Sequence, residues 1–218
     1  MTNSIAHPID FKKSSSKITV KDNLADFDLD SCPFSTFLNW YKKSMASELN
    51  IDAMSVATVD ANGTPRNRFL LFKGIVDSKF IFYTNYLSQK ARNLDQNPKV
   101  SLNFFWASTK YQVRVTGEAK KSSREFSEKY FSSRDRESQL ASAMSQQSSP
   151  VDSRDDLVKK VQDLNKQFPE IIPCPDHWGG YMLEPFEFEF FIYGAHRLND
   201  RFLFVKNKTE WTLSRLQP

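Results

Sequence analysis

The sequence predicts a mainly β protein with a few helices, in which antiparallel strands close fully or partly into a barrel. Short apolar runs separated by turn signals recur from residue 53 onward, which is typical of an antiparallel meander. Six or more such runs, interrupted by a few helical patterns, favour a barrel of mixed class. A chain of 218 residues is also long enough to form one domain with a sizeable core.

The N-terminal part of the chain divides into a polar segment and a helix. Residues 1–30 are polar and have no periodicity, so we expect a flexible N-terminal arm followed by a single domain over residues 31–218. The domain begins with an amphipathic helix, because apolar residues recur at three- and four-residue steps: Phe34, Phe37, Leu38, Tyr41 and Met45.

Five strands are expected next, over residues 54–59, 69–76, 79–84, 100–106 and 111–119. Asn62-Gly63 supplies a hairpin turn signal after the first of them. The last strand alternates strictly, with Tyr111, Val113 and Val115 on one side and polar residues on the other. Its polar side is therefore available for a ligand.

Helices and further strands alternate in the rest of the chain. Ser88 is a plausible N-cap for a short helix over residues 88–97, and Ser122 with Glu125 forms a capping-box signal for a second helix. A third helix is expected over residues 155–168, with its apolar residues on one face. Strand patterns then return at residues 178–183, 186–190, 201–205 and 211–216.

Composition excludes several classes of protein. The net charge of +4 suits a small anionic ligand as well as it suits weak attraction to nucleic acid. Cys32 and Cys174 stand outside any metal-ligand spacing, so neither a disulfide framework nor a metal site is indicated. No segment has the apolar length of a membrane span, and we expect a soluble cytoplasmic protein. Common catalytic motifs are also absent, which indicates that a cofactor supplies the reactivity.

Three clusters of polar residues are candidates for anion binding. Tyr130, Arg134 and Ser138 follow one another at four-residue steps, so a continuous helix would align them toward a phosphate monoester. Spacing alone equally fits a solvated helix face. Arg68 and Lys73 flank four apolar residues and would point to opposite faces of a regular strand, toward two separate anions, unless they only extend from the ends of a core strand.

The third cluster lies where the strand ending at Tyr83 and Thr84 leads into the helix that carries Lys90. Free N–H groups at a helix start and a lysine are suited to a phosphate, although many helices begin in this way. A dense group of charges also lies at residues 196–201, where a polar hairpin loop would explain it equally well.

Taken together, these motifs resemble the pyridoxine 5'-phosphate oxidase family. The resemblance runs in order from about residue 34 to residue 218, through the segments 68–73, 82–85, 146–149, 178–180, 197–201 and 215–218. It implies an FMN-binding split β-barrel and a homodimer with FMN at the interface. It also implies oxidation of pyridoxine or pyridoxamine 5'-phosphate to pyridoxal 5'-phosphate, with oxygen as electron acceptor and hydrogen peroxide as a product.

The resemblance also assigns roles to individual residues. Those that match the family's FMN-binding places are Arg68, Tyr83, Thr84, Lys90, Gln112, Gln147, Ser148 and Arg201, together with Phe191 as an aromatic wall beside the flavin. Those that match the place of the substrate phosphate are Lys73, Tyr130, Arg134 and Ser138. Arg197 matches the residue that lies over the substrate ring, and Asn199 is expected beside it as a second substrate-binding and catalytic residue.

The chain departs from the family pattern at four positions. Asn199 stands where His is usual, Phe191 where Trp is usual, Ile192 where Gln is common and Gln89 where Arg is frequent. An asparagine donates a hydrogen bond but does not titrate near neutral pH, so we expect a pH profile without an ionisation at position 199.

Two other functions remain open from the sequence. The chain resembles split-barrel flavoproteins in general, so a flavin reductase or a related enzyme with another substrate is one alternative. The other is a non-catalytic protein that binds FMN or pyridoxal phosphate. Binding to nucleic acid is not expected, because the strands lack the interleaved basic and aromatic residues of an RNA-binding sheet.

Overall fold

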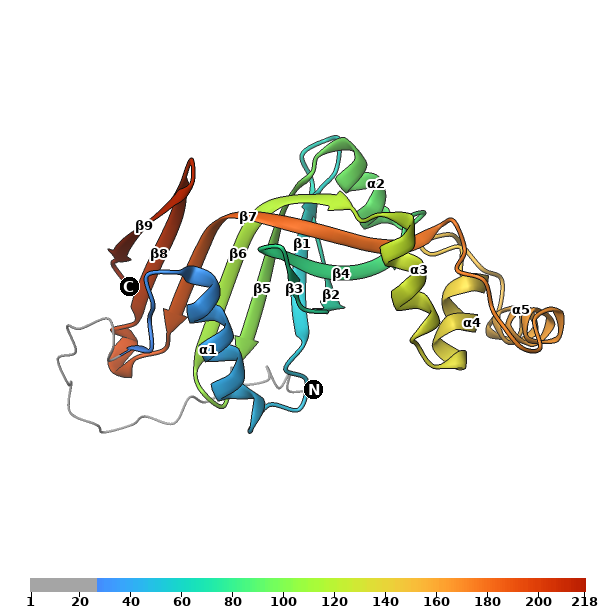
Figure 1. Cartoon of the computed structure of the whole chain (residues 1–218), viewed down its shortest axis with the longest axis horizontal. Coiled ribbons are helices and arrows are strands. Elements are labelled where there is room, and N and C mark those ends of the chain that lie inside the picture. Colours follow the sequence, from blue (N-terminus) through green and yellow to red (C-terminus); the bar gives the residue numbers. More distant parts are fainter. Residues whose placement is uncertain (1–26) are drawn as a thin grey trace, which may run out of the picture.

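Strands β1 (Ala53–Val59), β5 (Lys99–Trp106) and β6 (Tyr111–Lys121) each alternate buried and accessible residues, so one face of each strand lies in the core. In the computed structural model, which describes residues 27–218, these strands form the centre of a nine-stranded sheet (Figure 1). The other strands are β2 (Pro65–Leu71), β3 (Ile75–Val76), β4 (Lys79–Asn85), β7 (Trp178–Ile192), β8 (Asp200–Asn207) and β9 (Glu210–Leu216).

Every strand pair in the sheet is antiparallel, which confirms the predicted fold class. The strand order is β2-β1-β5-β6-β7-β4-β3, and β8 also pairs with β7 while β9 pairs with β8. The chain just after β2 pairs with the first part of β4, because the Lys73 N–H donates to the Ile81 carbonyl at 2.9 Å. The sheet therefore curls into the split barrel that the sequence predicts.

Strand β7 is one continuous strand of 15 residues, where two separate strands were expected. Its pairing with β6 shifts by one residue near Pro185, so Phe186 is the extra residue of a β-bulge. The buried side chains are accordingly Tyr181 and Leu183 before the bulge but Phe188 and Phe190 after it. In Figure 1, β7 crosses the molecule from the helices at one end to the β8–β9 hairpin at the other.

The helices lie at different places around the barrel. Helix α1 (Pro33–Met45) packs on the barrel interior through Phe37 and Trp40, and the Phe37 ring lies 4.9 Å from that of Phe80. Helix α2 (Gln89–Gln96) follows β4 directly. Helices α3 (Arg124–Ser132), α4 (Arg136–Met144) and α5 (Arg154–Gln167) gather at one end of the molecule (Figure 1). No helix of residues 27–218 has the length and apolar character needed to cross a bilayer.

Several boundaries differ from the prediction. The N-cap of α3 is Ser123 and not Ser122, because Ser123 Oγ accepts from the Phe126 N–H at 3.1 Å. Strand β2 begins at Pro65 and ends at Leu71, earlier than the expected range of 69–76. Lys73 therefore lies outside the strand, and strand alternation does not determine the side to which it points relative to Arg68. The expected arm is also too long at its end, because Phe27 and Leu29 are buried and the Phe27 carbonyl accepts a 3.0 Å hydrogen bond from Trp40 Nε1. The rest of the expected arm, residues 1–26, lies outside the described residues.

Candidate functional site

Two cations lie close together where β2 and β4 meet the start of α2. Arg68 Nη1 donates to the Val56 carbonyl and to Thr58 Oγ1, both at 2.9 Å. Lys90 is only 7% exposed, and its Nζ donates to Thr84 Oγ1 at 3.1 Å and to Gln147 Oε1 at 2.8 Å. Within residues 27–218, neither cation forms an ion pair with a carboxylate.

The electrostatics of this pair favour an anion. Burial, with a smaller contribution from the Arg68 charge, lowers the pKa of Lys90 to about 8. Burial also lowers the pKa of Arg68. Buried positive charges without a carboxylate are costly unless a ligand neutralises them. The pair is therefore suited to hold a phosphate group, with neutral partners such as Thr84 and Gln147 already in place.

A hollow of about 450 Å³ lies next to the pair, within the size range of small-molecule sites. Thr84 and Gln147, which contact Lys90, are part of its wall. Its wall also contains three of the residues expected around the substrate phosphate, namely Lys73, Tyr130 and Arg134. The structure thus brings the two predicted groups of phosphate-binding residues into one neighbourhood.

Aromatic rings form a flat side of this hollow. The Tyr83 and Tyr130 rings stack with centroids 3.9 Å apart and planes inclined by 13°, and Tyr83 also stacks on Trp178 at 5.3 Å. The Arg134 guanidinium lies 4.9 Å from the Trp178 ring centroid. Burial, with the neighbouring phenol of Tyr130 as a second cause, raises the pKa of Tyr83 to about 12, so its hydroxyl remains protonated at neutral pH.

The expected continuous helix through Tyr130, Arg134 and Ser138 is wrong. Tyr130 lies in the last turn of α3, Arg134 lies in the break, and Ser138 lies in the first turn of α4. The break arises because Asp135 starts a new helix, and its Oδ1 accepts from the Ser138 backbone N–H at 2.8 Å. Ser138 consequently does not line the hollow, whereas Ser142 does and accepts from Arg134 Nη1 at 2.7 Å.

Gln147 and Ser148 reach the start of α2 from the segment between α4 and α5. Ser148 Oγ accepts from the Gln89 backbone N–H at 3.2 Å, and its φ of 74° is left-handed. The two residues of this segment therefore meet the strand-to-helix junction at which Lys90 lies.

A second group of expected cofactor residues lies elsewhere, around the C-terminal end of β7. Gln112, Phe191 and Arg201 are direct neighbours across β6, β7 and β8. Gln112 Oε1 accepts from Tyr193 Oη at 3.0 Å, and the Arg201 guanidinium lies 5.9 Å from the Phe191 ring centroid. These three side chains form one row on the outer face of the sheet.

The two groups are too far apart for one ligand to contact both within a chain. Thr84 pairs with Gly179 near the start of β7, whereas Phe191 lies near its end. At about 3.3 Å per residue, this stretch of strand spans on the order of 35–40 Å, which exceeds the length of a mononucleotide. A single ligand held by both groups would therefore need a second copy of the chain.

Arg197 and Asn199 lie in the loop between β7 and β8. Arg197 is exposed and has a left-handed φ of 64°, next to His196 with φ of 56°. Asn199 Oδ1 accepts from the Gly194 N–H at 3.1 Å, and the Asn199 N–H donates to the Arg197 carbonyl at 2.9 Å. The Asn199 side chain thus closes the loop that carries Arg197.

Several residues of the hollow, among them Trp178, Ser142 and Asn85, were not predicted as site residues from the sequence. Trp178 belongs to a motif that supported the family resemblance, but nothing in the sequence indicates that Arg134 stacks on it. Ser142 shares no spacing signal with Arg134, because the chain turns between the two helices. Asn85 contributes through Nδ2, which donates to the Ser145 carbonyl at 2.7 Å and holds the end of α4 in place.

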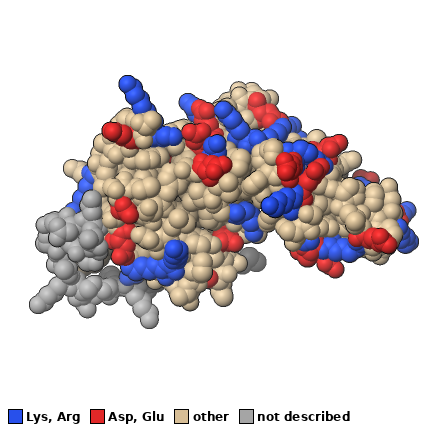
Figure 2. All heavy atoms as spheres, viewed as in Figure 1, with Lys and Arg blue, Asp and Glu red and all other residues tan. Residues whose placement is uncertain are grey.

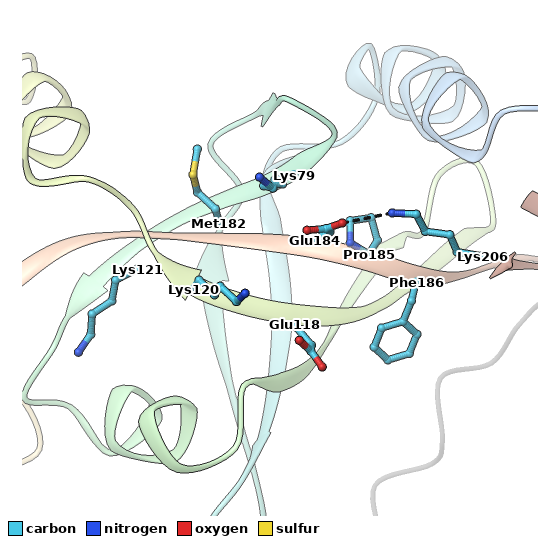
Figure 3. A pocket seen from close by; sticks show the side chains of 9 residues that line it. All are labelled: Lys79, Glu118, Lys120, Lys121, Met182, Glu184, Pro185, Phe186 and Lys206. Carbon is cyan, nitrogen blue, oxygen red and sulfur yellow. Dashed lines mark hydrogen bonds and ion pairs between the residues drawn. The ribbon is translucent and has the colours of Figure 1, made fainter. Parts of the chain in front are cut away.

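A further hollow, of about 490 Å³, is lined by basic residues but lacks the features of a site (Figure 3). Its lysines diverge, since Lys121 points away from the others and pairs with Asp95 at 2.9 Å. Lys206 pairs with Glu184 at 3.2 Å. On the face displayed in Figure 2, basic and acidic side chains are interspersed, and no patch of a single sign dominates.

Comparisons with known proteins point to one family. Residues 43–168 match the family model described as pyridoxamine 5'-phosphate oxidase, and residues 178–218 match that of the pyridoxine 5'-phosphate oxidase C-terminal dimerisation region. A pyridoxine/pyridoxamine 5'-phosphate oxidase of Hydrogenovibrio crunogenus is 43% identical, with 88% of this chain and 90% of that protein covered. The enzyme of that name from Coxiella burnetii is 40% identical, with 88% and 98% covered.

Solved structures show the same fold. PhzG from Burkholderia lata, in complex with tetrahydrophenazine-1-carboxylic acid, has a TM-score of 0.85 and 26% sequence identity, and the match covers 93% of this chain and all of that one. A pyridoxamine 5'-phosphate oxidase-related, FMN-binding protein from Nostoc punctiforme has a TM-score of 0.72 and 19% identity, with 86% and 98% covered.

Proposed function

Because the chain belongs to the pyridoxine/pyridoxamine 5'-phosphate oxidase family, we propose that it oxidises pyridoxine or pyridoxamine 5'-phosphate to pyridoxal 5'-phosphate. The enzyme is a flavoprotein of that family, and FMN is the flavin that the site is suited to bind. Oxygen is the electron acceptor, and hydrogen peroxide is released. The bound flavin supplies the redox chemistry by accepting a hydride from the substrate carbon, while the protein supplies binding and orientation.

The observation that carries this proposal is the pair formed by buried Lys90 and half-buried Arg68, which has no carboxylate partner among residues 27–218. Arg68 and Lys90 hold the FMN phosphate, and the Ser148 hydroxyl lies at the same junction to donate a further hydrogen bond. Thr84 and Gln147 orient the Lys90 ammonium from the protein side. Tyr83 lines the adjoining hollow with its aromatic ring.

The substrate phosphate binds in the adjoining hollow. Arg134 and Lys73 supply positive charge, and the Tyr130 hydroxyl supplies a directed donor. Arg134 is held in place by stacking on Trp178 and by its hydrogen bond to Ser142. Ser138 lies outside this wall, so Ser142 is the hydroxyl that lies beside the guanidinium.

A homodimer completes the site. The C-terminal match is to a dimerisation region, and it includes both Phe191 and Arg201. A second copy brings its own Gln112, Phe191 and Arg201 to the flavin held by Arg68 and Lys90 of the first chain. The loop between β7 and β8 carries Arg197 over the substrate ring. The Arg197 cation holds the ring in a reactive geometry. Asn199 fixes the backbone on which Arg197 lies and contributes its amide N–H₂ as a neutral donor.

One experiment tests the proposal directly. Purified protein reconstituted with FMN is expected to be yellow, and pyridoxine 5'-phosphate is expected to bleach the flavin band in the absence of oxygen. Readmission of oxygen restores the band and releases peroxide. Protein that stays colourless after incubation with FMN contradicts the proposal.

Further arms of this experiment separate the alternatives. A non-catalytic carrier binds FMN but shows no bleaching with either B6 phosphate. A flavin reductase is bleached by NADH or NADPH rather than by a B6 phosphate. Pyridoxine without its phosphate is expected to bleach the flavin only at much higher concentration, because Arg134 and Lys73 then have no phosphate to bind. Efficient bleaching by a phosphate-free carboxylic acid would favour a substrate of the kind that PhzG binds.

A further inference from the structure

A buried carboxylate joins two arginines on the outer face of the sheet. Glu189, in the second half of β7, is 6% exposed. Its Oε1 accepts from Arg201 Nε at 2.8 Å, and its Oε2 accepts from Arg114 Nη2. A carboxylate this deeply buried stays ionised only when it is paired with opposite charges and hydrogen-bonded. Each carboxylate oxygen of Glu189 accepts from a guanidinium group.

The contacts of Arg201 fix its guanidinium from two sides. Nε is held by Glu189, and Nη1 donates to the Gln217 carbonyl at 3.1 Å. The plane of the group lies near the Phe191 ring, with 5.9 Å between the Cζ atom and the ring centroid. A free arginine side chain has several rotatable bonds, and these contacts select one arrangement in advance of ligand binding.

We propose that Glu189 is the positioning residue of the flavin site: its carboxylate fixes the Arg201 guanidinium beside Phe191 without itself touching the flavin. This inference rests on the proposed function, because that function is what places Arg201 and Phe191 against the flavin of the partner chain. Glu189 lies two residues before Phe191 on the same face of β7, and its carboxylate oxygens contact Arg114 and Arg201.

The charges of the cluster support this role. Arg114 and Arg201 lie close enough that the Arg201 charge, after burial, contributes to lowering the pKa of Arg114. The carboxylate between them offsets this repulsion. Without it, the two guanidinium groups repel each other, and Arg201 loses its Nε partner as well. We therefore expect Arg201 to leave its position when Glu189 is neutralised, although the backbone pairing of β7 with β8 stays intact.

The test is the affinity of the apoprotein dimer for FMN, measured by quenching of flavin fluorescence. Glu189→Gln preserves shape but removes the charge and one acceptor, and it is expected to weaken FMN binding by about tenfold or more, as is usual when a supporting residue is lost. The matched control is Glu187→Gln, two residues earlier on the same face of β7, where the carboxylate accepts from the Thr116 hydroxyl at 3.3 Å and acts on Arg114 through its charge without a hydrogen bond to Arg201. The control is expected to change the affinity less than about twofold.

A double-mutant cycle separates positioning from a general loss of stability. If Glu189 acts through Arg201, the loss caused by Glu189→Gln largely disappears in an Arg201→Lys background. Losses that add in full contradict the inference, and so does a Glu189→Gln dimer that binds FMN as wild type does. If Glu189→Gln does not fold, Glu189→Asp takes its place in the cycle, because it keeps the charge but withdraws it from Arg201. Wild-type protein that fails to bind FMN refutes the proposed function instead, so the two failures are distinguishable.

Discussion

Lys90 donates a 2.8 Å hydrogen bond to the Gln147 side chain, although the two residues are 57 positions apart in the chain. The contact joins the first turn of α2 to the segment that follows α4. Through it, the expected FMN-phosphate site and the wall of the substrate hollow share a residue, since Gln147 lines that hollow. A change at Lys90 therefore acts on cofactor binding first, and its effect on substrate binding follows.

The lowered pKa of Lys90 predicts how FMN binding depends on pH. Lys90 in the apoprotein loses its proton as the pH rises through about 8, whereas the FMN phosphate is already dianionic above neutral pH. Binding favours protonated Lys90, so the FMN dissociation constant is expected to rise between pH 7 and about 9.5. Fluorescence titrations across this range measure the effect.

Lys90→Arg is the matched variant, because arginine keeps its charge throughout this range. We expect its FMN affinity to be flat with pH where that of the wild type falls. A wild-type affinity that does not change between pH 7 and about 9.5 would show that Lys90 does not bind the phosphate as a titrating cation.

Mixed dimers test whether the site takes residues from two chains. Lys90→Met and Arg201→Met are each expected to abolish most FMN binding. When the two variants are refolded together, half of the dimers are mixed, and each of those regains one intact site, so about one quarter of all sites recover. Recovery of flavin absorbance in the mixture measures this fraction. No recovery, despite proven subunit exchange, would place both residues in the site of a single chain.

Arg134→Ala is expected to raise KM for pyridoxine 5'-phosphate by about 10- to 100-fold, because a charged hydrogen bond to phosphate contributes roughly 1.5–3 kcal/mol. The affinity for FMN should stay the same, and so should the weak turnover of pyridoxine itself. Lys129→Ala is the control, since Lys129 is exposed on α3 and is not part of the hollow wall. Equal effects on phosphorylated and unphosphorylated substrate would show that Arg134 does not bind the phosphate.

Position 199 gives a graded set of variants. Asn199→Ala removes the acceptor of the Gly194 N–H, and we expect a lower kcat because the loop that carries Arg197 loosens. Asn199→Asp keeps the oxygen and should retain more of the activity. Asn199→His introduces a group that titrates near pH 6.5, so a new inflection in the pH–rate profile is expected. A histidine variant with unchanged rate and pH profile would leave position 199 without a role at the reacting centre.

Local patterns predicted the strands well, because alternation of apolar and polar residues is a property of each strand by itself. The core positions of β6, Val113 and Val115, follow directly from that alternation. Residue spacing failed to predict where a helix ends when a side-chain contact starts a new one. Asp135 caps a new helix and so separates Arg134 from Ser138, which a four-residue spacing cannot reveal.

The anion site was only partly visible in the sequence. Arg68 and Lys90 meet because β2 and α2 pack on the same end of β1, and such a meeting depends on tertiary contacts that no short motif encodes. The family resemblance linked the two residues. The structure adds the reason that they suit an anion, because Lys90 is buried, Arg68 is half-buried, and neither has a carboxylate partner within residues 27–218. The length of β7 also reveals a separation that the sequence did not show. It places this pair at a distance from Gln112, Phe191 and Arg201.

The extra residue at Phe186 marks a point in β7 at which the chain can change length without exposing its core residues. Removing Phe186 would convert the bulge into regular pairing, in which Glu187 follows Pro185 and both Phe188 and Phe190 still face inward, although the local bend would be lost. A one-residue deletion elsewhere in β7 would instead reverse which of the following side chains face the core. Homologous sequences that differ by one residue within β7 should accordingly place the gap at the bulge.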